Sequence, residues 1–582
     1  MQNLLFYFAA LWLVASCNAP EKKQNSIPPS QNSGVIGCAP QMVDTSWYSA
    51  GTKAPRLSGL DGIDFKISTK NKEAQAYFNQ GMMLSYGFNH AEAARSFFEA
   101  TRLDSTCAMA YWGFAYVLGP NYNAGMEDDN YQRAYKAVNK ALLLMGNCTE
   151  KEKALINALS ERYSEKAPTD RSILDLAFAN AMKKVYEHFP GDPDISALYA
   201  ESLMDMHPWD LYDKHTKAPK PWTPEIVSIL EKLMKQYPKH PGAPHFYIHA
   251  VEASATPERG LLAANLLMTM VPGSGHLLHM PSHIYIWTGD YHLGSLSNIA
   301  AVKTDSAYIT ACHAQGAYPL AYYPHNYHYL SATATLEGNS KLAWDAAKKV
   351  QEKTAKDIML QLGWGTLQHY FTVPYFVAVK FGLWDSILAI KSLHEDLIYP
   401  RVILHYAKGL AYLGKRDIVK AEHEFVQLQK LSKDTALKTM TIWNINTMLD
   451  IVQIAEHVLA AEIYRNKKDY NKAFEEYTKA VSIEDNLNYN EPPDWFFSVR
   501  HQMGGALLEA ARYKEAEKIY LEDLSVWKEN GWALSGLYEA LIKQGKIKEA
   551  QSVKNRFEKA WRYADFEVNK NMSLTGTTGM LK

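Results

Sequence analysis

Apolar positions along most of this chain recur every three or four residues, with polar side chains between them. This spacing places the apolar side chains on one face of an α-helix. From about Asn71 onward such segments follow one another with a period in the range that is typical of helical solenoids. No useful length of the two-residue alternation that marks a β-strand interrupts them. The pattern therefore predicts an all-α chain built by repetition, which suits 582 residues better than one ordinary core does.

Small and aromatic residues recur at fixed places within these segments. In the stretch YFNQGMMLSYGFNHAEAARSFFEA, small residues occupy Gly81, Ala93 and Ala100, and an aromatic ring occupies Phe97. Two helices approach closely only where one of them carries a small side chain, and an aromatic ring then fills the gap to the next unit. This order of residues resembles the tetratricopeptide repeat, a pair of antiparallel helices of about 34 residues. Further copies include Gly409, Tyr412, Ala421 and Phe425; Ala473, Tyr477 and Ala480; and Ala516 and Ala550.

The resemblance implies a right-handed superhelix of about a dozen antiparallel helix pairs over residues 71–563, followed by a tail over 564–582. Three stretches rich in Pro, Gly, Asn or Trp interrupt the repeats. We expect them to form loops or caps on one edge of the superhelix. They are GPNYNAGMEDDN, HPWDLYDKHTKAPKPWTP and EDNLNYNEPPDW.

The N-terminus has the features of an export signal. The apolar run LLFYFAALWLVAS is too short to span a bilayer comfortably and is typical of a signal peptide. It ends in LVASC, which resembles the lipobox of bacterial lipoproteins. This resemblance implies removal of residues 1–16 and attachment of a diacylglyceryl group to Cys17. Residues 17–70 begin with a Pro-, Ser- and Asn-rich stretch and are predicted to be a flexible tether. The chain would then be anchored in the cell envelope by lipid alone, and Asn18 favours the outer membrane over the inner one.

The charge balance and the cysteine content limit which partners and which cellular compartment are expected. Sixty-one Lys and Arg residues balance 62 Asp and Glu residues, without a basic block that could follow a phosphate backbone, so no nucleic-acid partner is expected. Four cysteines besides Cys17 would face an oxidising compartment, in which the sequence leaves their pairing open. They are Cys38, Cys107, Cys148 and Cys312.

Histidines are concentrated in the middle of the chain: of 20 in total, ten lie between His240 and His328. His245 and His279 are 34 residues apart, and so are His249 and His283, which makes them equivalent positions in adjacent repeats. Glycines that resemble the turn between the two helices of a repeat extend this register. Counting thirteen residues back from Gly289, Gly338 and Gly382 gives His276, His325 and His369.

In the tetratricopeptide family such first-helix positions typically face the concave groove, where ligands bind. The resemblance therefore implies a ladder of histidines along the groove, with three of them and a neighbouring tyrosine as partner-binding residues. These residues are His276, His325, His369 and Tyr327.

The same ladder suggests a metal site, because neutral imidazole is a common transition-metal ligand and histidines at i and i+4 on a helix suit Zn or Cu. The candidate ligands are His245, His249, Glu252, His279, His283 and His328. A second interpretation is that the rings simply pack and hydrogen-bond between helices. A third is a metal-dependent hydrolase, although Phe246 stands where the H-E-x-x-H motif has its glutamate base.

Several phrases of the chain, including HFYIHAVE, GHLLHMPSHIYIW and YYPHNYHYL, are similar to a broad bacterial group of large tetratricopeptide proteins. The resemblance implies a fold and no defined activity. The sequence therefore predicts a lipid-anchored envelope scaffold that binds a protein, a peptide or a saccharide in its groove, as in a nutrient or polysaccharide uptake system. The alternatives are a metal-binding protein and a metal-dependent hydrolase.

Overall fold

The computed structural model describes residues 45–312, 318–361, 363–391, 393, 395–495 and 497–568. The predicted signal peptide, Cys17 and Cys38 lie outside these residues, as does the side chain of Cys312. Cys107 and Cys148 are buried free thiols. Among the described helices, none combines the length and the apolar character that crossing a bilayer requires.

Nearly all the regular secondary structure of the described residues is helical, as predicted. The helices of the first half are α1 (Thr45–Ser49), α2 (Lys72–Tyr86), α3 (His90–Leu103), α4 (Ala108–Val117), α5 (Asn130–Leu144), η1 (Met145–Asn147), α6 (Glu150–Ser160), α7 (Ser172–His188), α8 (Pro193–Asp205), α9 (Thr223–Gln236), α10 (Gly242–Val251), η2 (Pro257–Gly260), α11 (Leu261–Met270), α12 (Gly275–His279) and α13 (Pro281–Thr288).

The second half continues in the same manner. It contains α14 (Tyr291–Cys312), η3 (Tyr318–Tyr322), α15 (Tyr323–Leu336), α16 (Ser340–Lys353), α17 (Gly365–Lys380), α18 (Trp384–Leu388), α19 (Ile398–Gly414), α20 (Ile418–Leu431), α21 (Ala436–Thr439), α22 (Met448–Asn466), α23 (Tyr470–Asp485), α24 (Val499–Glu509), α25 (Tyr513–Val526), α26 (Gly531–Lys543) and α27 (Ile547–Ala560). One short antiparallel hairpin, β1 (Thr441–Ile442) with β2 (Asn446–Thr447), precedes α22.

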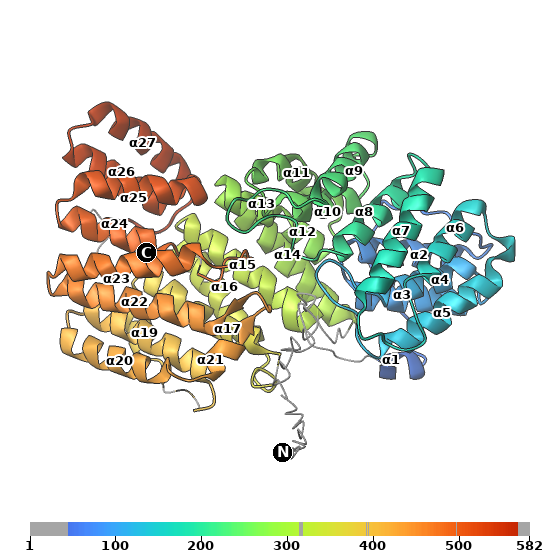
Figure 1. Cartoon of the computed structure of the whole chain (residues 1–582), viewed down its shortest axis with the longest axis horizontal. Helices are drawn as coiled ribbons and strands as arrows, with labels where there is room; N and C mark the ends of the chain where they lie inside the picture. Colours follow the sequence, from blue (N-terminus) through green and yellow to red (C-terminus); the bar gives the residue numbers. More distant parts are fainter. Residues whose placement is uncertain are drawn as a thin grey trace, which may run out of the picture.

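Consecutive helices pack against each other as pairs, for example α2 with α3, α15 with α16, and α22 with α23. Figure 1 shows these pairs stacked side by side from α2 to α27, with α10–α14 between an N-terminal and a C-terminal lobe. The prediction of an all-α solenoid of helix pairs is confirmed by this arrangement.

Glycines set the spacing and the turns of the pairs. A Cβ atom added at Gly81 of α2 would lie 2.7 Å from the ring of Phe97 on α3, so only glycine permits this crossing distance. Gly289, which ends α13, has a φ of 86°. This left-handed conformation is easily adopted by glycine and reverses the chain into α14. Gly338 and Gly382 also have positive φ values, so all three predicted turn glycines do terminate a first helix.

The segment before the first repeat differs from the prediction. Residues 52–70 were expected to belong to a flexible tether, but they lie in an extended conformation against α2. Leu60, Phe65 and Ile67 are buried, and their apolar side chains supply the contact that a Pro- and Ser-rich tether lacks. The ordered body likewise extends past the predicted end at 563, because the Phe566 ring packs against Trp532.

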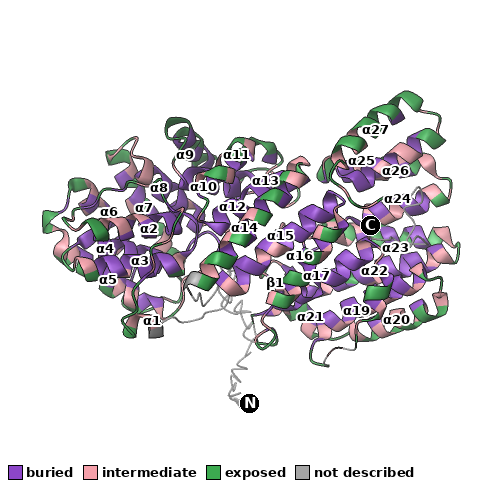
Figure 2. Cartoon of the chain, turned by 180° about the vertical axis from the view of Figure 1, so that it is seen from behind, coloured by how far each residue is buried: buried purple, intermediate pink, exposed green. Residues whose placement is uncertain are grey.

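Buried apolar residues form two large clusters, one from Ala54 to Tyr285 and the other from Ile286 to Val553. Figure 2 shows the buried residues concentrated between the helices, with exposed residues on outer helices such as α20 and α27. The division between the clusters falls within α13, so the histidine-rich segment lies at the junction of the two halves.

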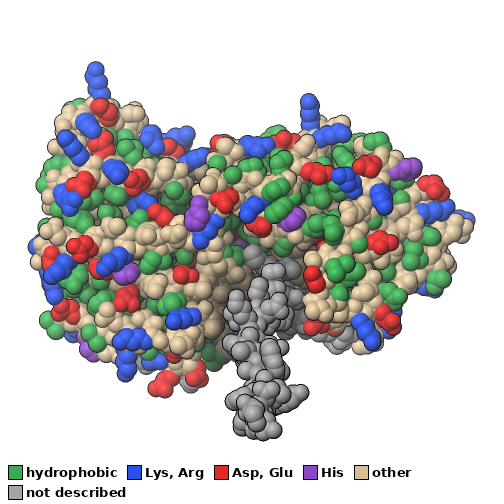
Figure 3. Space-filling view, in the orientation of Figure 1, with side chains coloured by type: hydrophobic (Ala, Val, Ile, Leu, Met, Phe, Trp, Pro, Cys, Tyr) green, Lys and Arg blue, Asp and Glu red, His purple; other side chains and the backbone are tan. Residues whose placement is uncertain are grey.

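Repeats that are distant in sequence also meet at this junction. The indole of Trp532 on α26 donates a hydrogen bond to the carbonyl of Thr335 on α15, and the Tyr291 hydroxyl donates one to the carbonyl of Lys528. The C-terminal repeats therefore fold back onto the middle of the chain. On the face shown in Figure 3, acidic and basic side chains are interspersed, as the near-zero net charge leads one to expect.

Candidate metal centre

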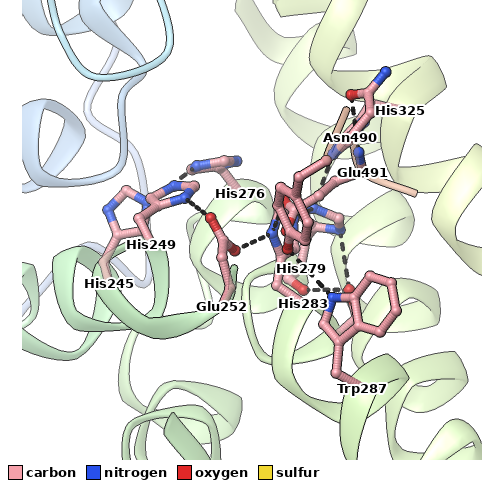
Figure 4. Close-up of polar contacts among 12 residues, drawn as sticks. His245, His249, Glu252, His276, His279, His283, Trp287, His325, Asn490 and Glu491 are labelled. Carbon is pink, nitrogen blue, oxygen red and sulfur yellow. Dashed lines mark hydrogen bonds and ion pairs between the residues drawn. The ribbon is translucent and has the colours of Figure 1, made fainter. Parts of the chain in front are cut away.

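Six histidines from the four helices α10, α12, α13 and α15 converge at the junction (Figure 4). His245, His249 and His276, from α10 and α12, form a group that we name triad 1. His279, His283 and His325, from α12, α13 and α15, form triad 2. Within each triad the ligand nitrogens lie within 4.8 Å of one another. The first five rings are at most 2 % exposed, and His325 is half-buried.

Triad 1 is closed by aromatic rings. The Nε2 atoms of His245 and His276 are 3.2 Å apart, and the His249 ring lies 5.0 Å from the His245 ring. Phe88, which follows α2, stacks against His249, and Tyr122 lies on another side of the same imidazole. These contacts exclude water from the rings and hold them in place.

Triad 2 is more compact. The Nε2 atom of His279 lies 2.7 Å from the Nε2 atom of His283 and 3.1 Å from that of His325. The Tyr329 ring stacks on the His283 imidazole. Zn–N bonds of about 2.0–2.1 Å in a tetrahedral site place two nitrogens roughly 3.3 Å apart, so a small outward movement of the rings would accommodate an ion.

The other ring nitrogens are held by oxygen atoms. His245 Nδ1 is 2.6 Å from the carbonyl oxygen of Tyr86, which can only accept a hydrogen bond. His279 Nδ1 is 2.7 Å from the side-chain oxygen of Asn298, and the amide nitrogen of Asn298 donates to the carbonyl of Gly294, which fixes the orientation of the amide. Both imidazoles therefore carry their proton on Nδ1 and direct an Nε2 lone pair into the cluster.

With these tautomers, the nitrogens that point into the cluster have too few hydrogen-bond donors around them. The single lone pair of His279 Nε2 faces two nitrogens, and one proton can bridge only one of the two contacts. His249 Nε2 is buried without any hydrogen-bond partner. A cation between the rings would satisfy all of these lone pairs together, whereas buried polar atoms otherwise rarely lack a partner.

Burial keeps most of the rings neutral. It lowers the pKa of His245 and of His325 to about 3, and it lowers the pKa values of His249, His276 and His279 well below the ordinary value. Neutral imidazole is the form that binds metal ions.

His283 is the exception. Burial opposes its charged form, but the carboxylates of Glu491 and Glu252 outweigh burial and raise its pKa to about 10. Without an ion, His283 is therefore the ring that carries a second proton. Burial and the charge of Glu491 raise the pKa of Glu252 well above its usual range, with His283 acting against them.

Two buried carboxylates support the rings from outside. One oxygen of Glu252 is 2.8 Å from His249 Nδ1, and the other is 2.7 Å from His283 Nδ1, so one carboxylate connects the two triads. Glu491 forms a second ion pair with His283 and accepts a hydrogen bond from the Tyr489 hydroxyl. Carboxylates behind metal-bound imidazoles orient the rings and increase their basicity.

A cavity of about 30 Å³ opens beside the cluster. His276, His283, His325 and Glu491 line it, together with residues from all three predicted insertions. Asn123 belongs to the first insertion, Trp209 to the second, and Asn490 and Glu491 to the third. The insertions therefore do not lie along an outer edge, as we expected, but cover the histidine face together.

Some of the predicted site residues have other contacts in the structure than the sequence led us to expect. His245, His249, Glu252, His279 and His283 meet, as a metal site requires, but His328 belongs to neither triad. It lies against His369 and Tyr370, because three residues of helix turn it about 60° away from His325, toward α17. His276 and His325, expected to contact a partner, complete the two triads.

The prediction that histidines contact a partner in an open groove also differs from the structure. His276 and His369 are at most 2 % exposed, so neither is available to a macromolecular partner, and Tyr327 and His325 are half-buried. His369 instead hydrogen-bonds to the Tyr399 hydroxyl.

Sequence reasoning did not identify Glu491, Tyr489 or Asn298 as part of the site. The only available signal for the first two was the loop NYNEPPDW, whose Glu and Tyr stand between two repeats. Nothing in the 34-residue register connects this loop to α10 or α13.

No family model matches the chain, and no curated protein matches its sequence. Solved structures with some similarity include the human IFIT1 dimer with m7Gppp-AAAA, at 15% identity over 85% of this chain and 91% of that one, with a TM-score of 0.28. Another is the TPR domain of P58(IPK), at 10% identity over 82% of this chain and 99% of that one, with a TM-score of 0.21. The architecture of this chain is therefore described by its own helix pairs and glycine crossings.

Proposed function

We propose that this protein binds a transition-metal ion in the histidine cluster between its two halves. The observation that carries the proposal is the convergence of Nε2 lone pairs whose tautomers are fixed by oxygen partners on the opposite nitrogen. Packing alone would leave His249 Nε2 without a partner, and it would allow the single lone pair of His279 Nε2 to pair with only one of its two nitrogen neighbours.

The donor set indicates which metals fit. Imidazole nitrogens suit Zn²⁺, Cu²⁺, Ni²⁺ or Fe²⁺, whereas Mg²⁺ and Ca²⁺ prefer oxygen ligands. Among the described residues, no cysteine belongs to the groups that could hold an ion. Zn and Cu, the metals expected from the i, i+4 spacing, are among the metals that this donor set suits.

Metal analysis of the purified full chain tests the proposal. We expect the wild-type protein to retain Zn²⁺ or Cu²⁺ after dialysis and to melt at a higher temperature with the ion than without it, because a ligand that binds only the folded state stabilises it. The double variant H249A/H283A should lose both the ion and the metal-dependent rise in Tm.

The matched control is H369A, which removes an equally buried imidazole outside both triads. It should lower the stability of the fold and still bind the ion. Wild-type protein that retains no metal, with a Tm that does not respond to metal, would contradict the proposal.

The setting that we propose is the cell envelope, with a lipid on Cys17 and the outer membrane favoured over the inner one. Support comes from the LVASC motif and from the Pro- and Ser-rich residues that follow it. Labelled palmitate should be incorporated by cells that express the wild-type chain and not by cells that express C17A. Equal labelling of the two proteins would refute the anchor.

Stacked helical repeats of this kind provide extended surfaces for protein interaction. We propose that a protein, peptide or saccharide partner docks outside the histidine face, because loops and distant repeats cover that face. The scaffold and the metal centre then occupy different parts of one molecule.

A further inference from the structure

We infer that the centre holds two metal ions, one in each triad, which share one small exchangeable ligand in the adjoining cavity. This inference rests on the proposed metal binding and adds to it the number of ions and the class of ligand. Three features of the site lead to it: the separation of the triads, the placement of the carboxylates and the position of the cavity.

The triads are separate but adjacent. Each contains three imidazoles, which is the usual protein share of an open four-coordinate site. Across the boundary, the His276 and His279 rings are 6.0 Å apart and the His249 and His283 rings are 5.8 Å apart. Ions in paired sites are typically about 3.5–4 Å apart. Imidazole rings at these separations can lie on either side of two ions at that distance.

The carboxylates are placed to balance two cations. Glu252 connects the outer nitrogens of the two triads, with one oxygen on each. Glu491 is 3 % exposed and borders both His283 and the cavity. Buried ions require opposite charge nearby, and two divalent ions would leave a positive excess here that a small anion can reduce.

A third grouping, His249, Glu252 and His283, could place a single ion between the triads. The hydrogen bonds that the Nδ1–H groups of His249 and His283 donate to Glu252 already satisfy that grouping without an ion. In triad 1, however, His249 Nε2 has no hydrogen-bond partner, and in triad 2 the single lone pair of His279 Nε2 faces two nitrogens. Each triad therefore keeps an atom that an ion of its own would satisfy, so two ions fit better than one.

The cavity faces both triads. His276 of triad 1 lines it together with His283 and His325 of triad 2. Its volume of about 30 Å³ exceeds the roughly 10–15 Å³ that one water molecule needs. Trp209, Tyr322 and Trp443 close its walls. A hydroxide ion or another small anion therefore fits.

Equilibrium dialysis of the full chain against Zn²⁺, followed by metal quantification, gives the first test. We expect two ions per wild-type chain, and one ion per chain in either H276A or H325A. One ion per wild-type chain, lost completely in both variants, would overturn the two-ion inference and leave the proposed function standing. Wild-type protein without bound Zn²⁺ would remove the proposed function as well. The wild-type count does not depend on whether a variant folds.

Azide binding to the Co²⁺-loaded protein tests the shared ligand. Azide should change the visible absorption of the bound Co²⁺ in the wild type and should have a smaller effect, or none, in H325A. An unresponsive wild-type spectrum with azide would overturn the small-ligand site.

Discussion

Each imidazole of the centre depends on the atom behind it. Glu252 is the clearest case, because its two oxygens hold the outer nitrogens of His249 and His283. Tyr86 and Asn298 hold His245 and His279 in the same way through a carbonyl and an amide oxygen. Substituting a residue that hydrogen-bonds to a metal-bound histidine typically reduces metal affinity about 10–100-fold. We therefore expect these residues to affect metal affinity although they do not contact an ion.

We therefore expect E252Q to bind metal about 10–100-fold more weakly than the wild type. Glutamine keeps the size of the side chain but offers one acceptor oxygen, so one of the two imidazoles loses its partner. Competition with a chromophoric chelator measures the affinity. The control is E424Q, which alters a glutamate paired with His405 outside the centre and should leave the affinity unchanged. Equal affinities of E252Q and wild type would show that Glu252 does not support the ligands.

At the level of the helices, glycine crossings determine how closely the two helices of a repeat approach. The prediction concerns Gly81, where an added Cβ would lie 2.7 Å from the Phe97 ring. Alanine normally stabilises a helix relative to glycine by about 1 kcal/mol, but forcing extra volume into a packed core costs about 1–3 kcal/mol.

We expect the overpacking to prevail, so that G81A has a lower Tm than the wild type in a thermal melt followed by circular dichroism. The control is G146A, since a Cβ at Gly146 meets nothing within 4 Å and should leave Tm unchanged or slightly higher. A Tm of G81A at or above that of the wild type would contradict the close crossing.

The helices also show what the sequence could predict. The turn glycines at 289, 338 and 382 gave the register of three repeats. A left-handed backbone conformation at the end of a helix favours glycine, and this preference does not depend on the position of the repeat in the chain. The same register relates His249 to His283, and their rings lie 5.8 Å apart, whereas His245 meets His276 instead of His279. It failed for His328, whose ring turns toward α17, because the register gives a position along the repeat and not which neighbouring helix the side chain meets.

Across the whole molecule, the metal centre depends on how tightly the superhelix winds. Each repeat of a solenoid contacts mainly its neighbours, so the helix pairs can be predicted from the sequence of each repeat separately. Phe88, His249 and Glu491 belong to distant repeats, and their meeting reflects the accumulated twist of all the pairs between them. No local pattern contains that information. The predicted open groove was therefore wrong at the histidines, while the predicted helix pairs were right.

The location of bound metal tests this description of the molecule most directly. Crystals of the full chain grown with Zn²⁺, with data collected on both sides of the zinc absorption edge, show the ion as an anomalous difference peak. We predict peaks among the Nε2 atoms of triad 1 and of triad 2, with Zn–N distances of about 2.0–2.1 Å. A map with no peak at either triad, or with zinc bound only at exposed histidines such as His215, would contradict the metal centre.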